Sequence, residues 1–340
     1  MAVCKIEKFI YSDRVFGRIE IDEPVILEII NTQAFQRLKG VNNGGYEKLA
    51  AKIYTKVNSY DNTRYDHSIG VYYLLRKFGA SIEEQIAGLI HDVSHMTFSH
   101  VADYVFKEGS EKTHSHQDNI HEEFVKNSEI AEIVKKYGFD LEYILNEKNF
   151  PLKEKNIPDL CADRIEYSLK TAALFQERDK YKLNEIIDSL LVQNKMWVFK
   201  NYDCALKFAK LFSMLNKIYW SGLESAYMFR VTADCLKYAL GKEYITKDDL
   251  YTTDAEVISK IKNHLDDDEL MKFWNRMDGK TSYENNPNDY DSHIFVKSRV
   301  VDPLCKHNGL IKRVSDVDEK WGKRVIDELQ PEEYFIKFKN

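Results

Sequence analysis

Seven of the ten histidines in this 340-residue chain fall between His67 and His121, and one of them, His91, stands directly before Asp92. A neutral imidazole and a carboxylate from a single turn offer one nitrogen and one oxygen ligand to a borderline-hard divalent ion. One His-Asp dipeptide alone is more often a solvated or core-bonded pair than a metal site. The pair is therefore informative only if further ligands can be positioned around it.

The sequence before His91 predicts a helix that ends at this pair. Ser81 and Glu84 have the spacing of a capping box at a helix N-terminus. Apolar residues then recur at helical offsets through the segment 82–90. A helix over this segment would bury one face and present His91 and Asp92 at its C-terminal end.

Two further helices are predicted to supply ligands. His67 begins a run of apolar residues at helical spacing up to Phe78, which places it on a buried stripe where an imidazole needs a polar partner. Pro158 stands where the first turn of a later helix tolerates proline, and Asp163 and Tyr167 lie four residues apart on one face of that helix. Facing helices commonly build metal sites from side chains projected in this way.

The whole chain reads as mainly α-helical with a few short strands. Further helical patterns cover roughly residues 121–136, 184–192, 203–219, 222–240 and 254–274. Alternation of β-branched and apolar residues predicts short strands in the first 20 residues and in the segment 292–314. We expect a metal-binding core in residues 1–180 and a helical C-terminal extension in residues 181–340, packed as one unit.

Composition sets broad limits on function. The formal net charge is −6 with 31% charged residues, which predicts no broad attraction to nucleic acid or membranes, so an anionic substrate must be held by local charge. The five cysteines are widely spaced and lack a CxxC motif, which favours buried free thiols over disulfides or a zinc knuckle. No apolar stretch of membrane-spanning length and no secretory leader pattern is present, so we expect a cytoplasmic protein.

The motifs around these residues resemble the HD superfamily of metal-dependent phosphohydrolases, whose signature is H…HD…D. Arg64–Val71 is similar to R-[FY]-x-H-S-[LI]-G-V, and His91–His100 is similar to HDxGHxPFSH. Asp163–Tyr167 resembles D-[RK]-x-[DE]-Y. Asp13–Ile19 and Phe35–Leu38 resemble the segment that precedes the domain in the deoxynucleoside triphosphate triphosphohydrolase branch. The resemblance implies a helical HD-domain bundle.

The resemblance also implies a role for each matched residue. One divalent ion would be bound by His67, His91, Asp92 and Asp163. Such a set suits iron, manganese, nickel, cobalt or zinc, with magnesium as an addition on the substrate phosphates, and spacing alone does not choose among them. Catalysis around the scissile phosphate would use His95, His100, Asp103 and His121. Substrate and its phosphates would be held by Arg64, Arg164, Asn43 and Tyr167.

Some residues in these segments have a plainer interpretation. His114 and His116 lie in a polar insertion between matched blocks, and we interpret them as solvated. Arg164 could pair with Glu166 or Asp92 rather than with a phosphate. Both interpretations can be tested by the positions of these side chains in the structure.

Departures from the family pattern concern the substrate more than the chemistry. Ser94 and Thr97 replace the glycine and proline of HDxGHxPFSH. The branch usually has an aspartate four residues after the tyrosine, where this chain has Thr171 next to Lys170. Losing that charge-assisted hydrogen bond puts deoxynucleoside triphosphate specificity in doubt. Tyr167 itself either packs in the core or contacts the sugar or base.

We therefore expect a metal-dependent phosphohydrolase that acts on a nucleotide by attack of metal-activated water on phosphorus, with a (deoxy)nucleoside triphosphate as the favoured substrate. The alternatives are a nucleotide monophosphatase or phosphodiesterase and, from another class, a catalytically silent HD module that binds nucleotide as a sensor. The complete ligand set argues against the silent module. A homo-oligomer is an expectation carried over from similar proteins. Replacing Asp92 by alanine should remove metal and activity and leave the helices intact.

Overall fold

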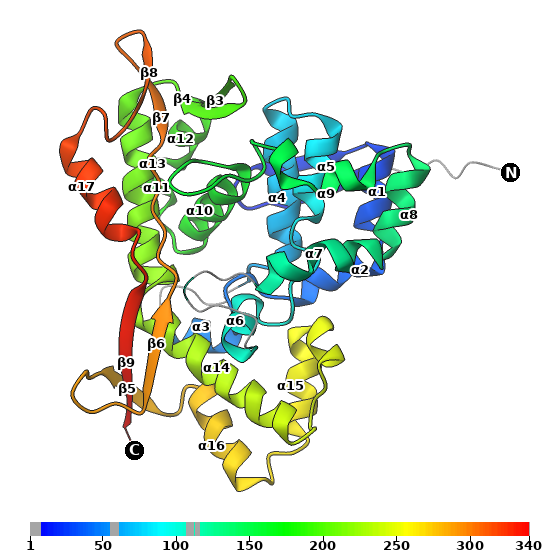
Figure 1. The fold of residues 1–340 in the computed structure, drawn as a ribbon, viewed down its shortest axis with the longest axis vertical. Coiled ribbons are helices and arrows are strands. Elements are labelled where there is room, and N and C mark those ends of the chain that lie inside the picture. Colours follow the sequence, from blue (N-terminus) through cyan, green and yellow to red (C-terminus); the bar gives the residue numbers. More distant parts are fainter. Residues whose placement is uncertain (1–7, 55–60, 107–111, 113–115, 340) are drawn as a thin grey trace, which may run out of the picture.

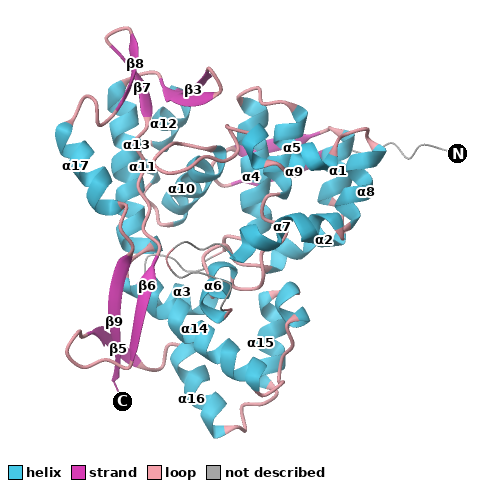
Figure 2. Ribbon diagram, viewed as in Figure 1, coloured by secondary structure: helices cyan, strands magenta, loops and turns pink. Residues whose placement is uncertain are grey.

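The structure is a computed structural model that describes residues 8–54, 61–106, 112 and 116–339. These residues form a mainly α-helical protein with a few short strands, as the sequence predicted (Figures 1 and 2). The helices are α1 (Pro24–Ile30), α2 (Gln33–Gln36), α3 (Glu47–Ile53), α4 (Arg64–Lys77), α5 (Ile82–Ile90), α6 (Ala102–Val105), α7 (His116–Lys126), α8 (Glu129–Lys136), α9 (Leu141–Leu145), α10 (Ala162–Leu174), α11 (Arg178–Tyr181), α12 (Leu183–Ser189), α13 (Tyr202–Leu215), α14 (Leu223–Gly241), α15 (Asp254–Lys262), α16 (Asp268–Met277) and α17 (Glu319–Glu328). Short 3-10 turns are η1 (Arg37–Gly40), η2 (Ser99–Val101), η3 (Glu147–Asn149) and η5 (Asp248–Tyr251), and η4 (Asn216–Trp220) is a π-helical turn.

The strands form three small sheets. They are β1 (Phe9–Asp13), β2 (Gly17–Ile21), β3 (Leu190–Gln193), β4 (Met196–Phe199), β5 (Ser282–Asn285), β6 (Ser292–Val296), β7 (Leu304–His307), β8 (Leu310–Arg313) and β9 (Glu332–Lys339). The strand orders are β1-β2, β3-β4-β7-β8 and β5-β9-β6. The predicted strands near the N-terminus and in 292–314 are confirmed, whereas β3, β4, β5 and β9 were not predicted.

Several predicted helices differ from the structure. The pattern over 121–136 is divided between α7 and α8, because Ser128 caps the start of α8, and the helix predicted over 184–192 ends at Ser189, where β3 follows. The pattern over 254–274 belongs to two helices, because Asp267 caps a new helix by accepting hydrogen bonds from the N–H groups of Glu269 and Leu270. Pro158 is not in a helix, since α10 begins at Ala162 and the proline lies in the turn before it. Proline favours turns as strongly as it favours a first helical turn, so its position alone was ambiguous.

The start of α5 is only half of the predicted capping box. Ser81 accepts a hydrogen bond from the backbone N–H of Glu84, as expected. The Glu84 carboxylate does not return to Ser81 but accepts from the backbone N–H groups of Leu152 and Lys153 at 2.7 and 3.0 Å. This carboxylate therefore joins the start of α5 to the segment that leads into α10.

Helices α4, α5 and α10 pack together and carry the predicted metal ligands. His67 lies in the first turns of α4, His91 caps the C-terminal end of α5, and Asp163 lies in the first turn of α10. Gly70 permits the close approach of α10 to α4, because a β-carbon there would lie 2.8 Å from both Cγ and Cδ of Glu166. The packing of these helices thus depends on a glycine beside the candidate site.

Replacing Gly70 by alanine is expected to destabilise the protein by about 1–3 kcal/mol, the usual range for overpacking a dense core. Alanine normally favours a helix over glycine, so a loss would identify the contact with Glu166 as the dominant effect. Urea unfolding measures it, with Gly241→Ala as the control, because a β-carbon on Gly241 meets no heavy atom within 4 Å. If Gly70→Ala and Gly241→Ala had equal midpoints of urea unfolding, the contact with Glu166 would not be the dominant effect.

Two clusters of buried apolar side chains stabilise the fold. One uses residues between Ile19 and Phe150, around α1, α5 and α8. The other extends from Val15 to Ile336 and joins α4 and α10 to α13 and α14. This second cluster bridges residues 1–180 and 181–340, whose division into two units stays a prediction. In the part of the chain that the structure describes, none of the helices combines the length and apolar character needed to cross a membrane.

Candidate active site

The predicted metal ligands converge between α4, α5 and α10. Nε2 of His67 lies 3.2 Å from Nε2 of His91 and 2.9 Å from Oδ1 of Asp163. The same Asp163 oxygen is 3.6 Å from His91 Nε2. Asp92 stands beside them, with Oδ2 3.6 Å from His67 Nε2 and Oδ1 3.5 Å from His91 Nε2. The four side chains are thus brought together from α4, from the C-terminal end of α5 and from α10, which lies far from the other two in the sequence.

The two imidazoles are held in the tautomer that a divalent ion requires. Nδ1 of His91 faces the carbonyl oxygen of Gly88 at 2.7 Å. A carbonyl only accepts, so Nδ1 carries the proton and Nε2 keeps its lone pair for a metal. Nδ1 of His67 donates to the buried carboxylate of Glu166, an arrangement that commonly orients metal-binding histidines. The donor set, two Nε2 atoms and carboxylate oxygens, therefore fits a divalent metal.

The charges around His67 also favour a cation. Burial lowers the pKa of His67, but the carboxylates of Glu166, Asp163 and Asp92 outweigh it and raise that pKa to about 10. Burial raises the pKa of Asp163, but His67 and His91 hold it well below its usual value. The site thus stabilises a positive charge at the point where the two Nε2 atoms meet.

Arg64 is the buried counter-ion of Asp92. Its Nη1 lies 2.7 Å from Asp92 Oδ2, and the two side chains are 6% and 5% exposed. Its Nε donates to Ser99 Oγ at 2.9 Å. Arg64 and His91 outweigh the burial of Asp92 and hold its pKa well below the usual value. Arg64 lines the cavity described below, and its predicted contact with phosphate stays a prediction.

The predicted catalytic histidines line the same cavity as the metal ligands. His95 Nε2 lies 3.3 Å from Asp92 Oδ1, which places it against the candidate metal site. His100 Nδ1 lies 3.3 Å from Asp103 Oδ2, so this carboxylate can orient the ring, as predicted. The rings of His95 and His100 are perpendicular, with centroids 5.3 Å apart.

Helix α7 supplies the fourth predicted catalytic residue. His121 Nδ1 lies 3.1 Å from Ser94 Oγ, and Gln117 Nε2 donates to the same oxygen at 3.0 Å and to the carbonyl of His91 at 2.7 Å. Ser94, which replaces the family glycine, thereby ties the turn after α5 to α7. Gln117 was missed by the sequence analysis, because nothing local indicates a bond to a turn 23 residues away.

The two other histidines of the polar insertion have different outcomes. His116 is not simply solvated, because its ring stacks on Phe106 at 5.2 Å and its backbone N–H donates to Asp103 Oδ1 at 2.9 Å. It therefore helps to hold the carboxylate that orients His100. His114 lies outside the described residues.

Burial keeps two of the predicted catalytic histidines neutral at pH 7. It lowers the pKa of His95 to about 4, with Arg64 acting in the same direction, and that of His121 to about 4, with Lys153 acting in the same direction. A neutral imidazole can accept a proton, and an anionic phosphate beside it would raise its pKa again.

Stability is therefore expected to fall as the pH is lowered from about 6.5 toward 4. In that window the unfolded chain binds a proton at His121 and the folded protein does not, which opposes folding by up to about 3 kcal/mol. His121→Gln removes this contribution, so the stability of the variant relative to wild type should rise as the pH falls. Urea unfolding at pH 7.5, 6.5, 5.5 and 4.5 tests it. If the stabilities of His121→Gln and wild type changed with pH in parallel, His121 would not be held neutral by the fold.

Arg164 also lines the cavity, but protein groups engage its guanidinium. Nη2 lies 3.1 Å from Glu154 Oε1, so its ion-pair partner is Glu154, not Glu166 or Asp92 as the alternative supposed. Nη1 lies 3.0 Å from Cys161 Sγ. Contact of Arg164 with a phosphate stays a prediction.

Glu154, Cys161 and Asp163 also lie close enough together to hold an ion. Arg164 contacts the first two of them and supplies their counter-charge, so this group needs no metal. Burial raises the pKa of the Cys161 thiol well above its usual value, which disfavours a thiolate ligand. All described cysteines are free thiols, as predicted; Cys161, Cys235 and Cys305 are buried, whereas Cys204 is partly exposed. Cys4 lies outside the described residues.

One cavity of about 550 Å³ joins these groups. Besides the histidines it is lined by Asn43 and Tyr167, which were predicted to hold the substrate, and by Thr171, where the chain departs from the family pattern. The ring of Tyr167 packs edge-on against Trp220, with centroids 4.9 Å apart. Tyr167 thus packs against an aromatic neighbour and also borders the cavity, and its contact with a sugar or base stays a prediction.

Glu166 is a candidate functional residue that the sequence analysis missed. Its Oε1 lies 2.8 Å from Lys170 Nζ, which in turn lies 3.1 Å from Asp13 Oδ2. This buried group holds the carboxylate that bonds to His67 Nδ1. One signal was available, because Glu166 follows Asp163 by three residues and shares its helix face.

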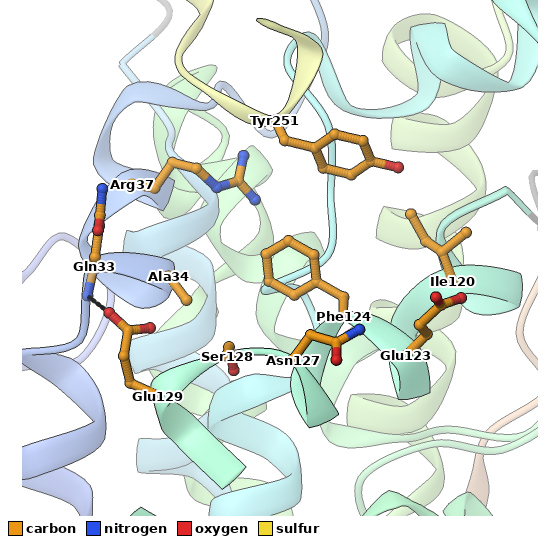
Figure 3. A pocket seen from close by; sticks show the side chains of 10 residues that line it. All are labelled: Gln33, Ala34, Arg37, Ile120, Glu123, Phe124, Asn127, Ser128, Glu129 and Tyr251. Carbon is orange, nitrogen blue, oxygen red and sulfur yellow. Dashed lines mark hydrogen bonds between the residues drawn. The ribbon is translucent and has the colours of Figure 1, made fainter. Parts of the chain in front are cut away.

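A second cavity, also of about 550 Å³, uses a different face of α7 (Figure 3). Arg37 points into it beside the rings of Phe124 and Tyr251. The Arg37 guanidinium donates to the carbonyl oxygens of Val93 and His95 at 2.8 and 2.7 Å. Arg37, within the Phe35–Leu38 segment, therefore fixes the turn that carries the predicted catalytic residue His95.

Comparisons with known proteins agree with this geometry. The HD domain family matches residues 64–184, which include all four predicted metal ligands. The chain is 33% identical to the uncharacterized protein YdhJ of Bacillus subtilis, over 91% of this chain and 92% of that protein. It is 30% identical to the metal-dependent phosphohydrolase cns2 of Cordyceps militaris, over 62% of this chain and 60% of that protein.

Deoxynucleoside triphosphate triphosphohydrolase SAMHD1 of Gallus gallus is 30% identical over 39% of this chain, a match that spans 24% of that larger protein. The solved structure of a phosphohydrolase from Bacteroides thetaiotaomicron has a TM-score of 0.74, covers 98% of this chain and 100% of its own, and is 17% identical, which shows a shared fold. The predicted metal ligands, the family match and these relatives agree. The chain therefore belongs to the HD domain family of metal-dependent phosphohydrolases.

Proposed function

We propose that this phosphohydrolase acts on a nucleotide, with a (deoxy)nucleoside triphosphate as the favoured substrate. The observation that carries the proposal is the composition of the cavity that contains the metal ligands. It is also lined by basic side chains, Lys153, Lys155, Arg164, Lys297 and Arg299, and by aromatic side chains, Tyr167, Tyr219, Trp220 and Phe229. Phosphates need cations, and a base and sugar need flat apolar surfaces with few polar groups.

Each group of the site has a proposed task in the reaction. A divalent ion held by His67, His91, Asp92 and Asp163 would supply Lewis-acid chemistry at a phosphate oxygen. His95, neutral and against Asp92, is placed to accept a proton from the nucleophile. His100, oriented by Asp103 through Nδ1, would donate a proton to the leaving oxygen once an anion has raised its pKa.

The nucleotide part of the proposal rests on two observations of unequal weight. The aromatic wall of the cavity is the stronger. The named activity of the SAMHD1 relatives is the weaker, because the match covers a small part of those proteins. Thr171 lines the cavity where the related branch has an aspartate, so recognition of the sugar must differ from that branch.

Product analysis tests the proposal. Protein loaded with manganese, iron, nickel, cobalt or zinc is given dGTP, dAMP or bis(p-nitrophenyl) phosphate, and the products are separated. We expect deoxyguanosine and tripolyphosphate from dGTP. Asp163→Ala, prepared in parallel, controls for contaminating phosphatases. Orthophosphate from dAMP or cleavage of the diester would instead identify the monophosphatase or phosphodiesterase alternative. Absence of turnover with every metal, together with measurable nucleotide binding, would support the silent sensor.

A cytoplasmic location and a homo-oligomeric state stay predictions. Fractionation of cells and light scattering of the purified protein test them independently of activity.

A further inference from the structure

An extended segment from the C-terminal half of the chain forms part of the wall of the catalytic cavity. It follows β6 and runs alongside α13 toward β7 (Figure 1). Side chains of an extended chain alternate between two faces. Val296, Ser298 and Val300 are only 0%, 3% and 0% exposed and face the core. Lys297 and Arg299, on the opposite face, line the cavity.

Buried hydrogen bonds fix this segment. Asn216, in the π-helical turn η4, donates through Nδ2 to Ser298 Oγ at 2.9 Å and accepts through Oδ1 from the N–H of Arg299 at 3.0 Å. Ser298 Oγ donates to the carbonyl of Glu328 at 2.8 Å. Asn216 is fully buried. The direction in which Lys297 and Arg299 project is therefore set by the core and not by the cavity.

The charge of Lys297 is less closely paired than that of other cations in the cavity. Four other cations that line the cavity have carboxylate partners, namely Arg64 with Asp92 (2.7 Å), Lys153 with Glu147 (2.8 Å), Arg164 with Glu154 (3.1 Å) and Lys155 with Asp159 (4.0 Å). Among the described residues, no carboxylate lies within the 4.0 Å ion-pair distance of Lys297 Nζ. Burial, and then Arg299, lower the pKa of Lys297 to about 8, although Asp118, which lines the same cavity, acts in the opposite direction. An anion placed here would raise that pKa again.

The two cations lie beside the groups proposed to act on the scissile bond. Burial and Arg64 lower the pKa of His100 most, and Arg299 and Lys297 add to that effect across the cavity. Arg164 likewise lowers the pKa of Lys297. Lys297 and Arg299 are therefore close enough to His100 to affect its pKa, and Lys297 is close enough to Arg164 to be affected by it.

We propose that Lys297 and Arg299 form a second oxyanion site, which binds phosphate groups of the substrate other than the one held at the metal ligands. The inference rests on the proposed function and deepens it, because a second oxyanion site is useful only for a substrate with a polyphosphate chain. It favours nucleoside triphosphates over monophosphates and simple diesters. The two residues lie outside the segment 64–184 that matches the HD domain family, so they are a feature of the C-terminal half of this chain.

Calorimetric binding of inorganic tripolyphosphate and of orthophosphate to the metal-loaded full-length protein tests the site without turnover. Lys297→Met should weaken tripolyphosphate binding by about tenfold or more, the loss usual for a charged hydrogen-bond donor. Orthophosphate binding should change by less than about twofold, because orthophosphate would bind at the metal ligands, where Lys297 makes no contact. Lys297→Arg should bind nearly as wild type does. Lys306→Met, an exposed lysine on β7, is the matched control.

The kinetic counterpart is a rise in KM for dGTP in Lys297→Met with little change in kcat. If Lys297→Met binds tripolyphosphate as Lys306→Met does, the second oxyanion site is wrong even when dGTP is hydrolysed. An equal loss for orthophosphate and tripolyphosphate would place Lys297 at the metal-held phosphate and overturn the inference as well. If tripolyphosphate binding depends on Lys297 but no nucleotide is hydrolysed, the site stands and the proposed function fails. Thermal unfolding of each variant shows that it is folded.

Discussion

Asp163→Ala is expected to lose the bound metal and to lower the rate of phosphoester hydrolysis by about a thousandfold or more. Asp163 Oδ1 is 2.9 Å from His67 Nε2 and 3.6 Å from His91 Nε2, so its removal leaves the two imidazoles without their shared carboxylate. The side chain is 23% exposed and lies in the first turn of α10, where alanine is tolerated. The loss of fold stability should stay within about 1 kcal/mol, the value of one acidic residue near a helix N-terminus.

Two measurements separate loss of metal from loss of fold. Elemental analysis should give below about 0.1 ion per chain for Asp163→Ala after dialysis, because a missing ligand weakens binding sharply. A chelator should lower the melting temperature of the metal-loaded wild type and leave that of Asp163→Ala unchanged, since only a bound ion stabilises by mass action. Asp188→Ala, at an exposed position on α12, is the control. A full complement of metal in Asp163→Ala would remove this residue from the ligand set.

The positions of the candidate metal ligands could be predicted because the signals for them are local. His67 sits on an apolar stripe that α4 buries, and the cap at Ser81 and the apolar spacing locate α5 to within a residue. His91 then follows at the end of α5 as predicted. Each of these features depends on neighbours within one or two helical turns, which a sequence displays directly.

The interactions that tune the site could not be predicted in the same way. Glu166 reaches His67 across 99 residues, and Gln117 reaches the turn after α5. Lys297 enters the cavity because Asn216 fixes the segment after β6, 82 residues further along the chain. Nothing local in the sequence links such pairs, since they arise only when helices pack. Strand β9 illustrates another limit, because it lies between β5 and β6 and is specified by both partners.

The structure changes what is expected of Asp92→Ala. The sequence predicts loss of metal and activity in an otherwise intact helical protein. In the structure, however, Asp92 is also the partner of Arg64, at 2.7 Å, with both side chains buried. Removing one partner of a buried ion pair leaves an uncompensated charge, which commonly costs about 3–5 kcal/mol. Asp92→Ala should therefore lose activity as fully as Asp163→Ala and, unlike it, should also unfold at a markedly lower urea concentration.

A second substitution distinguishes the two effects of Asp92. Arg64→Met in the Asp92→Ala background removes the unpaired cation and should recover about half or more of the lost stability, while metal binding and activity stay absent. Asp92→Asn keeps the size of the side chain. It should be more stable than Asp92→Ala and less stable than the double variant. If Asp92→Ala is as stable as Asp163→Ala, the pair with Arg64 contributes nothing to the fold. Arg64 would then be available for the phosphate contact that the sequence analysis predicted. The stability of one variant therefore decides between two roles of the same arginine.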